Sequence, residues 1–362
     1  MVNAIIFSMD AAEIAQQAAN GLTLGLLYAL IALGYTLVYG VLQLINFAHG
    51  EIMMFGAFYA YAFMEPMSVE TASGLAALSA LAAGVTAWDR FGSRRGRIAG
   101  ACATVLAGGL FGGAAYALSR AQLGLVAAVL AALPYSALLA AALERIAYRP
   151  LRAENRLIPL ISAIGASLFL QNLAQVDPWF FGTIRKSYTQ IPPSLHNEAF
   201  SALGVRISNL QMLIAFVAVV MLTGLHLFIT HSRLGTAIRA TAQNRRVAAL
   251  MGIDTDGVIV LTFALGAVLA AVAGVLYGIY LGSIYPFMGY MAGIKAFTAA
   301  VLGGIGSVPG AMVGGLVLGV LESVGAAFID EGYKDAIAFA ILIAVLLFRP
   351  SGIMGSSTRE KV

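Results

Sequence analysis

IAQQAANGLTLGLLYALIALGYTLVYGVLQLINFAHG, residues 14–50, is a run of 37 consecutive positions without an Asp, Glu, Lys or Arg. A helix that crosses the hydrocarbon core of a bilayer needs about 20 apolar residues. In lipid, only helices and closed barrels satisfy all backbone hydrogen bonds. Because the apolar residues in this run are continuous and do not alternate, the run predicts membrane helix.

The same run is too long for one crossing. As a single helix it would extend about 55 Å, whereas the hydrocarbon core is about 30 Å thick. The chain must therefore break, and the polar residues of INFAHGE, residues 45–51, mark the place. Asn46 and Gly50 offer polar capping and backbone freedom. Glu51 then falls in the first turn of the next helix, where the helix dipole favours a negative charge.

Two interpretations of Asn46, His49 and Glu51 remain open. They can form a cap between two helices on the cytoplasmic side of the membrane. Alternatively, they can line a translocation path, because polar groups at membrane depth usually face a cavity. A third interpretation makes His49 and Glu51 the acid–base pair of an intramembrane enzyme, but the sequence offers no nucleophile or metal partner for it.

The composition extends the membrane prediction to the whole chain of 362 residues. Hydrophobic residues make up 60% and charged residues only 10%, whereas a soluble domain carries about 25% charged residues. We therefore predict an all-α polytopic integral membrane protein with about 9–11 transmembrane helices, some of them short or broken. The candidate crossings are residues 20–40, 48–64, 72–87, 97–118, 122–143, 157–175, 209–230, 257–283, 291–305, 309–328 and 335–348.

The basic residues predict the orientation. With eleven crossings, the loops 90–97, 145–156 and 233–246 and the tail 349–361 all lie on one side and hold fifteen of the 21 Lys and Arg residues. The positive-inside rule makes that side the cytoplasm. The N-terminus is then outside and the C-terminus cytoplasmic. No soluble basic domain is present, so we expect no nucleic-acid partner.

The polar loop 231–256 is a candidate contact surface. Residues 235–251 predict a short amphipathic helix, and Gly252 fits its C-terminal cap. Such a helix either lies at the lipid headgroups or docks in a groove of a soluble partner. The residues alone favour neither.

A second interruption lies in AAVLGGIGSVPGAMVGGLVLGV, residues 299–320. Small residues let helices approach closely, and Gly or Pro interruptions in membrane helices can also mark a transport site. Packing and a tight turn explain most of these glycines. The candidates for a translocation path here are Gly303, Gly304, Gly306 and Pro309.

Other functional motifs are missing from the sequence. There is no GxxxxGK[ST] phosphate loop, no HExxH and no GxSxG, and the single cysteine and four scattered histidines predict no metal site. We expect a non-enzyme without a cofactor of its own. A stand-alone secondary transporter or channel is a further alternative, but the lack of a buried Asp, Glu and Lys series argues against it.

Seven blocks in order carry a resemblance to a known family. The chain resembles the LivH-type permeases of high-affinity branched-chain amino acid ABC importers from about Asn20 to the C-terminus. The blocks are NGLTLGLLYALIALGYTLVYG (20–40), INFAHGEIMMFGAF (45–58), ERIAYRPLR (144–152), LIPLISAIGASLFLQN (157–172), RATAQNRRVAALMGIDTD (239–256), MAGIKAFTAAVLGGIGSVPGAMVGGLVLG (291–319) and YKD (333–335).

This resemblance implies a single transmembrane permease domain, residues 1–362, in the bacterial inner membrane and in contact with lipid. It implies a LivM-like second permease, LivG- and LivF-like ATPases that hydrolyse ATP, and a periplasmic amino-acid-binding protein. Leucine, isoleucine and valine are the implied substrates. Urea, short amides or other amino acids are the alternative, since related permeases carry them.

The resemblance also implies a role for the polar loop 231–256. Residues 235–252 look like the coupling helix that ABC permeases insert into their ATPases, with Arg239, Asn244, Arg245 and Gly252 as its contact and shaping residues. One departure from the family is residues 86–121, which we interpret as an additional helical hairpin.

Overall fold

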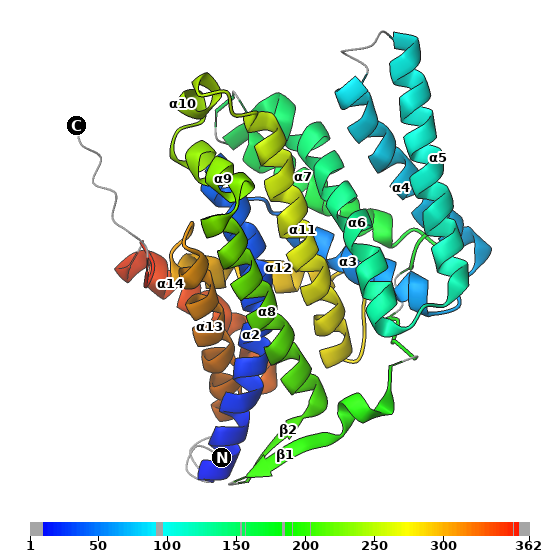
Figure 1. Cartoon of the computed structure of the whole chain (residues 1–362). Helices are drawn as coiled ribbons and strands as arrows, with labels where there is room; N and C mark the ends of the chain where they lie inside the picture. Colours follow the sequence, from blue (N-terminus) through cyan, green and yellow to red (C-terminus); the bar gives the residue numbers. More distant parts are fainter. Residues whose placement is uncertain are drawn as a thin grey trace. The chain divides into compact units, whose positions relative to one another are not determined.

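The computed structural model describes residues 10–91, 97–152, 154–155, 157–182, 185–189, 191–202, 204–349 and 351–354. Figure 1 shows an almost entirely helical chain. The α-helices are α2 (Ala11–Leu42), α3 (His49–Met64), α4 (Val69–Phe91), α5 (Arg97–Ala121), α6 (Leu125–Leu143), α7 (Leu157–Ala174), α8 (Asn209–His231), α9 (Arg233–Gln243), α10 (Arg245–Leu250), α11 (Thr255–Tyr280), α12 (Met288–Gly303), α13 (Val308–Phe328) and α14 (Lys334–Phe348).

Shorter elements join these helices. A π-helical turn, η1 (Glu144–Tyr148), and a 3-10 turn, η2 (Arg149–Leu151), follow α6 directly. Two more 3-10 turns are η3 (Pro193–His196) and η4 (Glu331–Tyr333). The strands β1 (Glu198–Ala202) and β2 (Val205–Ser208) form an antiparallel hairpin.

The predicted fold class is confirmed, and each of the eleven predicted crossings corresponds to one helix. Eight described helices are long and apolar enough to cross a membrane, and α12 is a shorter apolar helix. The short helices α3, α12 and α14 have 16, 16 and 15 residues. Sixteen residues extend only about 24 Å, so the prediction that some of the transmembrane helices are short is confirmed.

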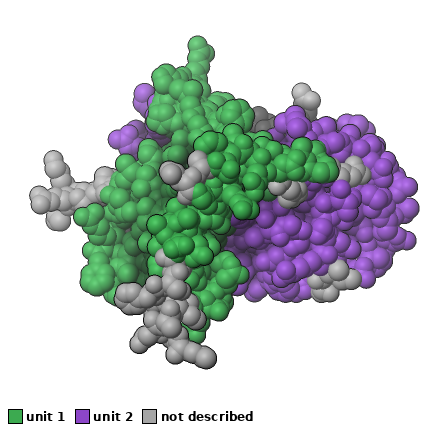
Figure 2. Space-filling model, turned by 90° about the horizontal axis from the view of Figure 1, so that it is seen from below, with its two compact units in different colours: residues 1–40, 192–236, 294–362 green, residues 41–191, 237–293 purple. Residues whose placement is uncertain are grey.

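The chain divides into two compact units, which Figure 2 colours green and purple. Unit 1 comprises residues 1–40, 192–236 and 294–362, and unit 2 comprises residues 41–191 and 237–293. That the chain acts as a single permease domain stays a prediction.

In unit 1, α2 and α13 cross with backbone against backbone. A Cβ atom on Gly21 would lie 2.7 Å from the carbonyl oxygen of Gly319, and one on Gly25 would lie 2.7 Å from that of Gly315. Both helices present glycines four residues apart, the small-residue spacing that lets membrane helices approach closely. Glycine is required here because any side chain would hold the two helices apart.

α2 begins at Ala11, earlier than the predicted crossing, and amide side chains explain the extra turns. Gln16 exchanges two hydrogen bonds with the backbone of Arg206 on β2, at 3.0 and 2.7 Å. Ser323 of α13 donates to Gln17 at 3.1 Å. The polar start of α2 is therefore held by the hairpin and by α13, which a search for apolar runs does not detect.

In unit 2, α3 is buried almost throughout and α11 packs against both α3 and α6. Aromatic rings fill the space around α3: Phe58 stacks on Phe181 with ring centroids 4.0 Å apart, and Tyr59 stacks on Tyr135 at 5.3 Å. The loop before Pro192 closes over this core, where the Tyr188 hydroxyl donates to the carbonyl of Ala57 at 3.0 Å. Burial raises the pKa of Tyr188, so its hydroxyl stays a donor.

The predicted extra hairpin, residues 86–121, comprises the last turns of α4 and the whole of α5, and residues 92–96 between them lie outside the described residues. The two helices lie side by side (Figure 1), with Gly112 against the carbonyl of Ala76. α5 therefore packs on α4 through small residues. That this hairpin is additional to the family stays a prediction.

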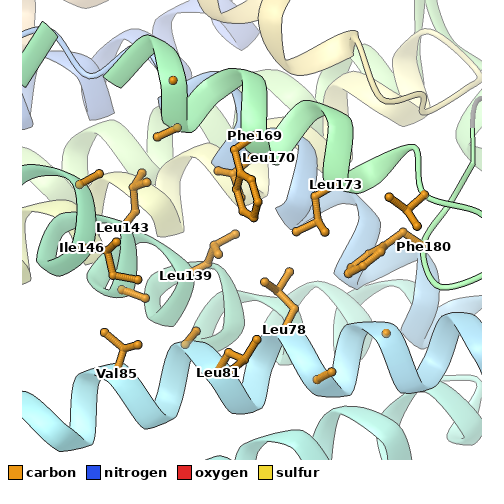
Figure 3. Close-up of a pocket in the computed structure, with 18 of the residues that line it drawn as sticks. Leu78, Leu81, Val85, Leu139, Leu143, Ile146, Phe169, Leu170, Leu173 and Phe180 are labelled. Atoms are coloured by element: carbon orange, nitrogen blue, oxygen red, sulfur yellow. The ribbon is translucent and has the colours of Figure 1, made fainter. Parts of the chain in front are cut away.

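An apolar cavity of about 940 Å³ opens between α4, α6 and α7 (Figure 3). Its walls are formed by side chains such as Leu78, Leu139 and Phe169, and no charged residue lines it. A zwitterionic amino acid would find no partner for either of its charges there. This cavity is therefore no candidate for the substrate site.

Candidate functional site

The polar residues of INFAHGE lie inside the core of unit 2. Asn46, His49 and Glu51 are 2%, 1% and 0% exposed. The Tyr148 hydroxyl of η1 donates to Asn46 Oδ1 at 2.6 Å, and the Ser167 hydroxyl of α7 donates to Glu51 Oε1 at 3.1 Å. The motif thus connects the start of α3 to the segments that follow α6 and form α7.

The chain breaks here as predicted, but the predicted cap is wrong in detail. α2 ends at Leu42, followed by Gln43 with a φ of +56°. The N-cap of α3 is Ala48, which makes no side-chain cap bond, and Asn46 contributes only its backbone carbonyl to His49 N at 3.0 Å. The Asn46 side chain is instead engaged by Tyr148. Glu51 lies in the first turn, as predicted.

Gly50 serves packing rather than a turn. A Cβ atom on Gly50 would lie 2.2 Å from the carbonyl oxygen of Gly289, at the start of α12. Glu51 Oε2 lies at the same contact and has no hydrogen-bond partner among the described residues. A buried carboxylate oxygen without a donor is costly in a packed core. Such a group is more typical of a functional position than of a simple cap.

The glycine-rich interruption forms a helical hairpin in unit 1. α12 ends at Gly303, Gly304 and Gly306 have φ of +103° and +97°, and α13 begins with Ser307 as its N-cap. Pro309 follows in the first turn of α13, where its missing N–H costs nothing. The turn is therefore built as the residue types predict.

The C-terminal segment closes the end of α12. The amide of Ile353 donates to the carbonyl of Leu302 at 2.8 Å, and that of Met354 donates to Gly303 at 3.0 Å. These carbonyls belong to the last turn of α12 and would otherwise have no intrahelical partner. The path candidates Gly303, Gly304, Gly306 and Pro309 thus belong to unit 1, whereas Asn46, His49 and Glu51 belong to unit 2.

Unit 1 contains a buried ion cluster that sequence reasoning missed. Lys295 Nζ of α12 lies 2.7 Å from Glu322 Oε1 of α13 and 2.7 Å from Asp335 Oδ1 of α14. The Tyr28 hydroxyl of α2 also donates to Glu322, at 3.3 Å. The Lys295 and Glu322 side chains are only 12% and 1% exposed. Asp335 is 45% exposed. The chain therefore has a buried Lys–Glu pair, which the expected lack of buried charges did not foresee.

The basic loop folds as two short helices instead of the single helix predicted. α9 ends at Gln243 and α10 starts at Arg245, because Asn244 adopts an extended backbone with φ −158°. The Asn244 side chain accepts a hydrogen bond from the amide of Val247 at 3.1 Å. Asparagine is among the strongest N-cap residues, so it starts a new helix where the apolar pattern alone predicts continuity.

Gly252 ends α10 as predicted. Its φ is +84°, its amide donates to Ala249 at 3.1 Å, and the next amide, of Ile253, donates to Ala248 at 3.1 Å. This pair of bonds is a Schellman motif, which needs a left-handed residue and favours glycine. α10 is therefore fixed at both ends, by Asn244 and by Gly252.

Part of the predicted apolar face of this loop points outward. Ile238 of α9 and Ala248 of α10 are buried at 4% and 3% exposure. In contrast, Val247, Leu250 and Met251 are 52%, 86% and 77% exposed. Arg239 and Asn244 are exposed as well. The loop thus presents three apolar side chains beside basic and polar ones.

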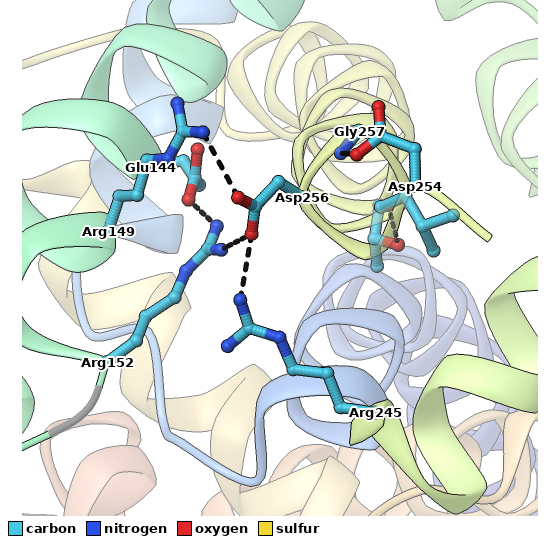
Figure 4. A network of polar contacts seen from close by, with 9 residues as sticks. Glu144, Arg149, Arg152, Arg245, Asp254, Asp256 and Gly257 are labelled. Atoms are coloured by element: carbon cyan, nitrogen blue, oxygen red, sulfur yellow. Dashed lines mark hydrogen bonds and ion pairs between the residues drawn. The ribbon is translucent and has the colours of Figure 1, made fainter. Parts of the chain in front are cut away.

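Arg245 is held by an ion cluster at the start of α11 (Figure 4). Asp256 accepts hydrogen bonds from three guanidinium groups: Arg149 at 3.1 Å, Arg152 at 2.8 Å and Arg245 at 2.8 Å. Arg152 also pairs with Glu144, which is fully buried. We refer to Glu144, Arg149, Arg152, Arg245 and Asp256 as the Asp256 cluster.

The chain matches a known family over nearly its whole length. Residues 17–346 match the family described as "Branched-chain amino acid transport system / permease component". No solved structure is significantly similar to the chain.

Individual relatives of the chain are also transport permeases. The permease protein BraD of the high-affinity branched-chain amino acid transport system of Pseudomonas aeruginosa is 45% identical over 351 residues, 96% of this chain and 97% of BraD. LivH of Escherichia coli K12, from the corresponding system, is 42% identical over 358 residues, again 96% and 97% of the two chains. The permease LsrC of the autoinducer 2 import system of Yersinia enterocolitica is 30% identical over 142 residues, 37% of this chain and 39% of LsrC. The chain belongs to the family of branched-chain amino acid transport permeases, the family that its seven sequence blocks predict.

Proposed function

We propose that this chain is the membrane-spanning permease subunit of an ATP-driven importer for leucine, isoleucine and valine. It forms the translocation path together with a second, LivM-like permease in the bacterial inner membrane. Support comes from the relatives BraD and LivH, which match this chain over nearly their full length. The alternative substrate is urea, a short amide or another amino acid, because related permeases carry such solutes.

Uptake against a gradient needs an energy source. A thousandfold gradient costs about 4 kcal/mol, since each tenfold is about 1.4 kcal/mol. We assign the supply of that energy to LivG- and LivF-like ATPases, which hydrolyse ATP on the cytoplasmic side. A periplasmic binding protein delivers the amino acid to the permease. In this arrangement the N-terminus is outside and the C-terminus and the basic loop are cytoplasmic, as the positive-inside rule predicts.

The observation that carries the proposal is the surface of α10. Leu250 and Met251 are 86% and 77% exposed, although the helix that carries them is fixed at both ends. A helix that lays apolar side chains in a groove is a common mode of recognition. The exposed apolar side chains fit docking to a soluble ATPase, with Arg239 as a neighbouring charge. Arg245, which bonds to Asp256, would couple this surface to the rest of unit 2.

The two chain breaks are our candidates for the path itself. Asn46, His49 and Glu51 place polar groups in the core of unit 2, and the hairpin from Gly303 to Pro309 interrupts the helices of unit 1. Broken membrane helices expose backbone groups that can bind the charged ends of a solute. These residues are proposed as path residues on that ground.

The variant Leu250→Glu tests the docking surface. Introducing a carboxylate at the exposed tip of α10 should weaken ATPase binding, because a buried unpaired charge at an interface costs several kcal/mol. We expect the amount of ATPase that co-purifies with the permease to fall at least about tenfold, since each 1.4 kcal/mol of binding free energy corresponds to a tenfold change in affinity. Co-purification of a tagged permease with its ATPases measures this directly.

Phe200→Glu on β1, whose side chain is 59% exposed, is the matched control. It places the same charge on another exposed apolar residue, outside the basic loop and outside the predicted crossings. If Leu250→Glu retains its ATPases as well as the unmodified chain does, α10 is not the docking helix. If Phe200→Glu alone loses them, the contact lies elsewhere.

A further inference from the structure

The Asp256 cluster connects the basic loop to the helices of unit 2. Asp256 is the second residue of α11, and its two carboxylate oxygens receive all three guanidinium groups. Arg245 comes from the first position of α10, whereas Arg149 and Arg152 come from the segment that follows α6. One carboxylate at the start of α11 thus joins α10 to the segment after α6, which lies more than 100 residues before Asp256 in the sequence (Figure 4).

The connection continues into the core. Arg152 is 5% exposed and pairs with Glu144, whose side chain is fully buried. Glu144 directly follows the last residue of α6 and starts η1. A buried ion pair of this kind holds its two segments in a fixed geometry, because separating the partners leaves an uncompensated buried charge.

The covalent connection between α10 and α11 is short. Only residues 251–254 separate the two helices, and the Schellman motif at Gly252 fixes the direction in which the chain leaves α10. α11 then packs along α3 and α6. A displacement of α10 therefore reaches α11 through this turn, and reaches the end of α6 through the Arg245, Asp256 and Arg152 side chains.

We propose that Asp256 is the positioning residue that transmits movement of the ATPase-docked α10 to α6 and α11. This inference rests on the proposed function, because it assumes an ATPase bound at α10. It assigns Arg245 an internal role: its guanidinium group binds Asp256, and the exposed apolar residues of α10 make the contact with the partner. Without the Asp256 charge, the guanidinium groups of Arg149, Arg152 and Arg245 would repel one another, and α10 would move independently of α6.

The experiment uses the complete complex, with both permeases, the ATPases and the binding protein, in proteoliposomes. It measures ATPase co-purification, ATP hydrolysis and the number of leucine molecules taken up per ATP. For Asp256→Asn we expect the ATPases to remain bound and hydrolysis to continue. Leucine taken up per ATP should fall about tenfold, since residues in one ion network couple by energies that correspond to this factor.

Asp254→Asn is the matched control. It removes the same charge two residues earlier. The Asp254 side chain caps α11 by accepting a hydrogen bond from the amide of Gly257 at 3.1 Å, and asparagine can replace aspartate in this role. We expect its leucine uptake per ATP to match that of the unmodified complex. Asp256→Glu, which keeps the charge, should restore part of the loss.

Arg245→Gln separates the internal role from a direct contact. Alone, it should lower leucine uptake per ATP with the ATPases still bound, and in the Asp256→Asn background it should add no further loss. This variant also carries the test if Asp256→Asn does not reach the membrane, because Arg245 lies at the exposed edge of the cluster.

Additive losses from Arg245→Gln and Asp256→Asn, or an unchanged ratio in Asp256→Asn, would overturn the inference and leave the proposed function standing. In contrast, leucine uptake by the unmodified complex without ATP, or an absence of bound ATPase, would overturn the proposed function itself.

Discussion

Substituting Gly319 by alanine is expected to force α2 and α13 apart and to remove most of the folded chain from the membrane. The added Cβ atom would lie 2.3 Å from Gly25 N and 2.4 Å from the carbonyl oxygen of Gly21. Both neighbours are backbone atoms and cannot rotate away. Overpacking a core costs about 1–3 kcal/mol when side chains can adjust, so we expect a loss of at least the upper value. The amount of chain in the membrane and its thermal unfolding in detergent measure the effect.

Gly224→Ala in α8 is the control for this substitution. Gly224 also lies in a helix of unit 1, but its added Cβ has no described atom within 4 Å beyond its chain neighbours and the adjacent turns of α8. Replacing a helical glycine by alanine without a clash stabilises by roughly 0.5–1 kcal/mol. We therefore expect the amount of Gly224→Ala in the membrane to equal or exceed that of the unmodified chain. If Gly319→Ala were as stable as the unmodified chain, the close crossing of α2 and α13 would be contradicted.

Lys295→Met is expected to have the second large effect. It leaves the Glu322 carboxylate, which is 1% exposed, without its cation among apolar helices. Breaking a buried ion pair by removing one partner typically costs about 3–5 kcal/mol. Among the described residues, the Tyr28 hydroxyl at 3.3 Å would remain as a hydrogen-bond donor to Glu322 Oε1. Thermal unfolding of the purified chain should show this loss of stability as a lower unfolding temperature.

The double variant Lys295→Met with Glu322→Leu distinguishes a structural from a functional role. Replacing both charges of a buried pair by apolar groups is often neutral or stabilising, so we expect most of the lost stability to return. If the double variant is stable but does not support leucine uptake, the pair takes part in transport. A double variant that is less stable than Lys295→Met would contradict the ion pair seen between α12 and α13.

The helices of this chain can be predicted because the membrane imposes a simple rule on them. Long, mostly apolar runs with few charges marked all the crossings, including the short helices α3, α12 and α14. The rule misses polar extensions such as residues 11–19 of α2, whose amide side chains bond to β2 and α13. It also misses the break at Asn244, although asparagine before an apolar turn is a signal for an N-cap.

Contacts between distant residues are harder to predict. Lys295 lies 27 residues from its partner Glu322, and each appears in the sequence as a lone charge in an apolar helix. Asp256 and Arg149 are separated by 107 residues. Nothing in their local patterns says that they meet, because helix packing decides it. A lone charge within an apolar helix, such as Lys295 or Glu322, is the signal that would have prompted a search for a partner.

The INFAHGE motif lies between these two cases. Its position at a chain break and the location of Glu51 in a first helical turn follow from helix length and helix electrostatics. The contacts of Asn46 with Tyr148 and of Glu51 with Ser167 do not, since they join residues 102 and 116 positions apart.

Radiolabelled leucine uptake in the native cell, with and without this gene, tests the central claim most directly, with urea as the comparison solute. The proposed function predicts that leucine uptake at low concentration collapses when the gene is removed, that restoring the gene restores it, and that urea uptake is unaffected. Unchanged leucine uptake together with a loss of urea uptake would contradict the assignment of branched-chain amino acids as the substrate.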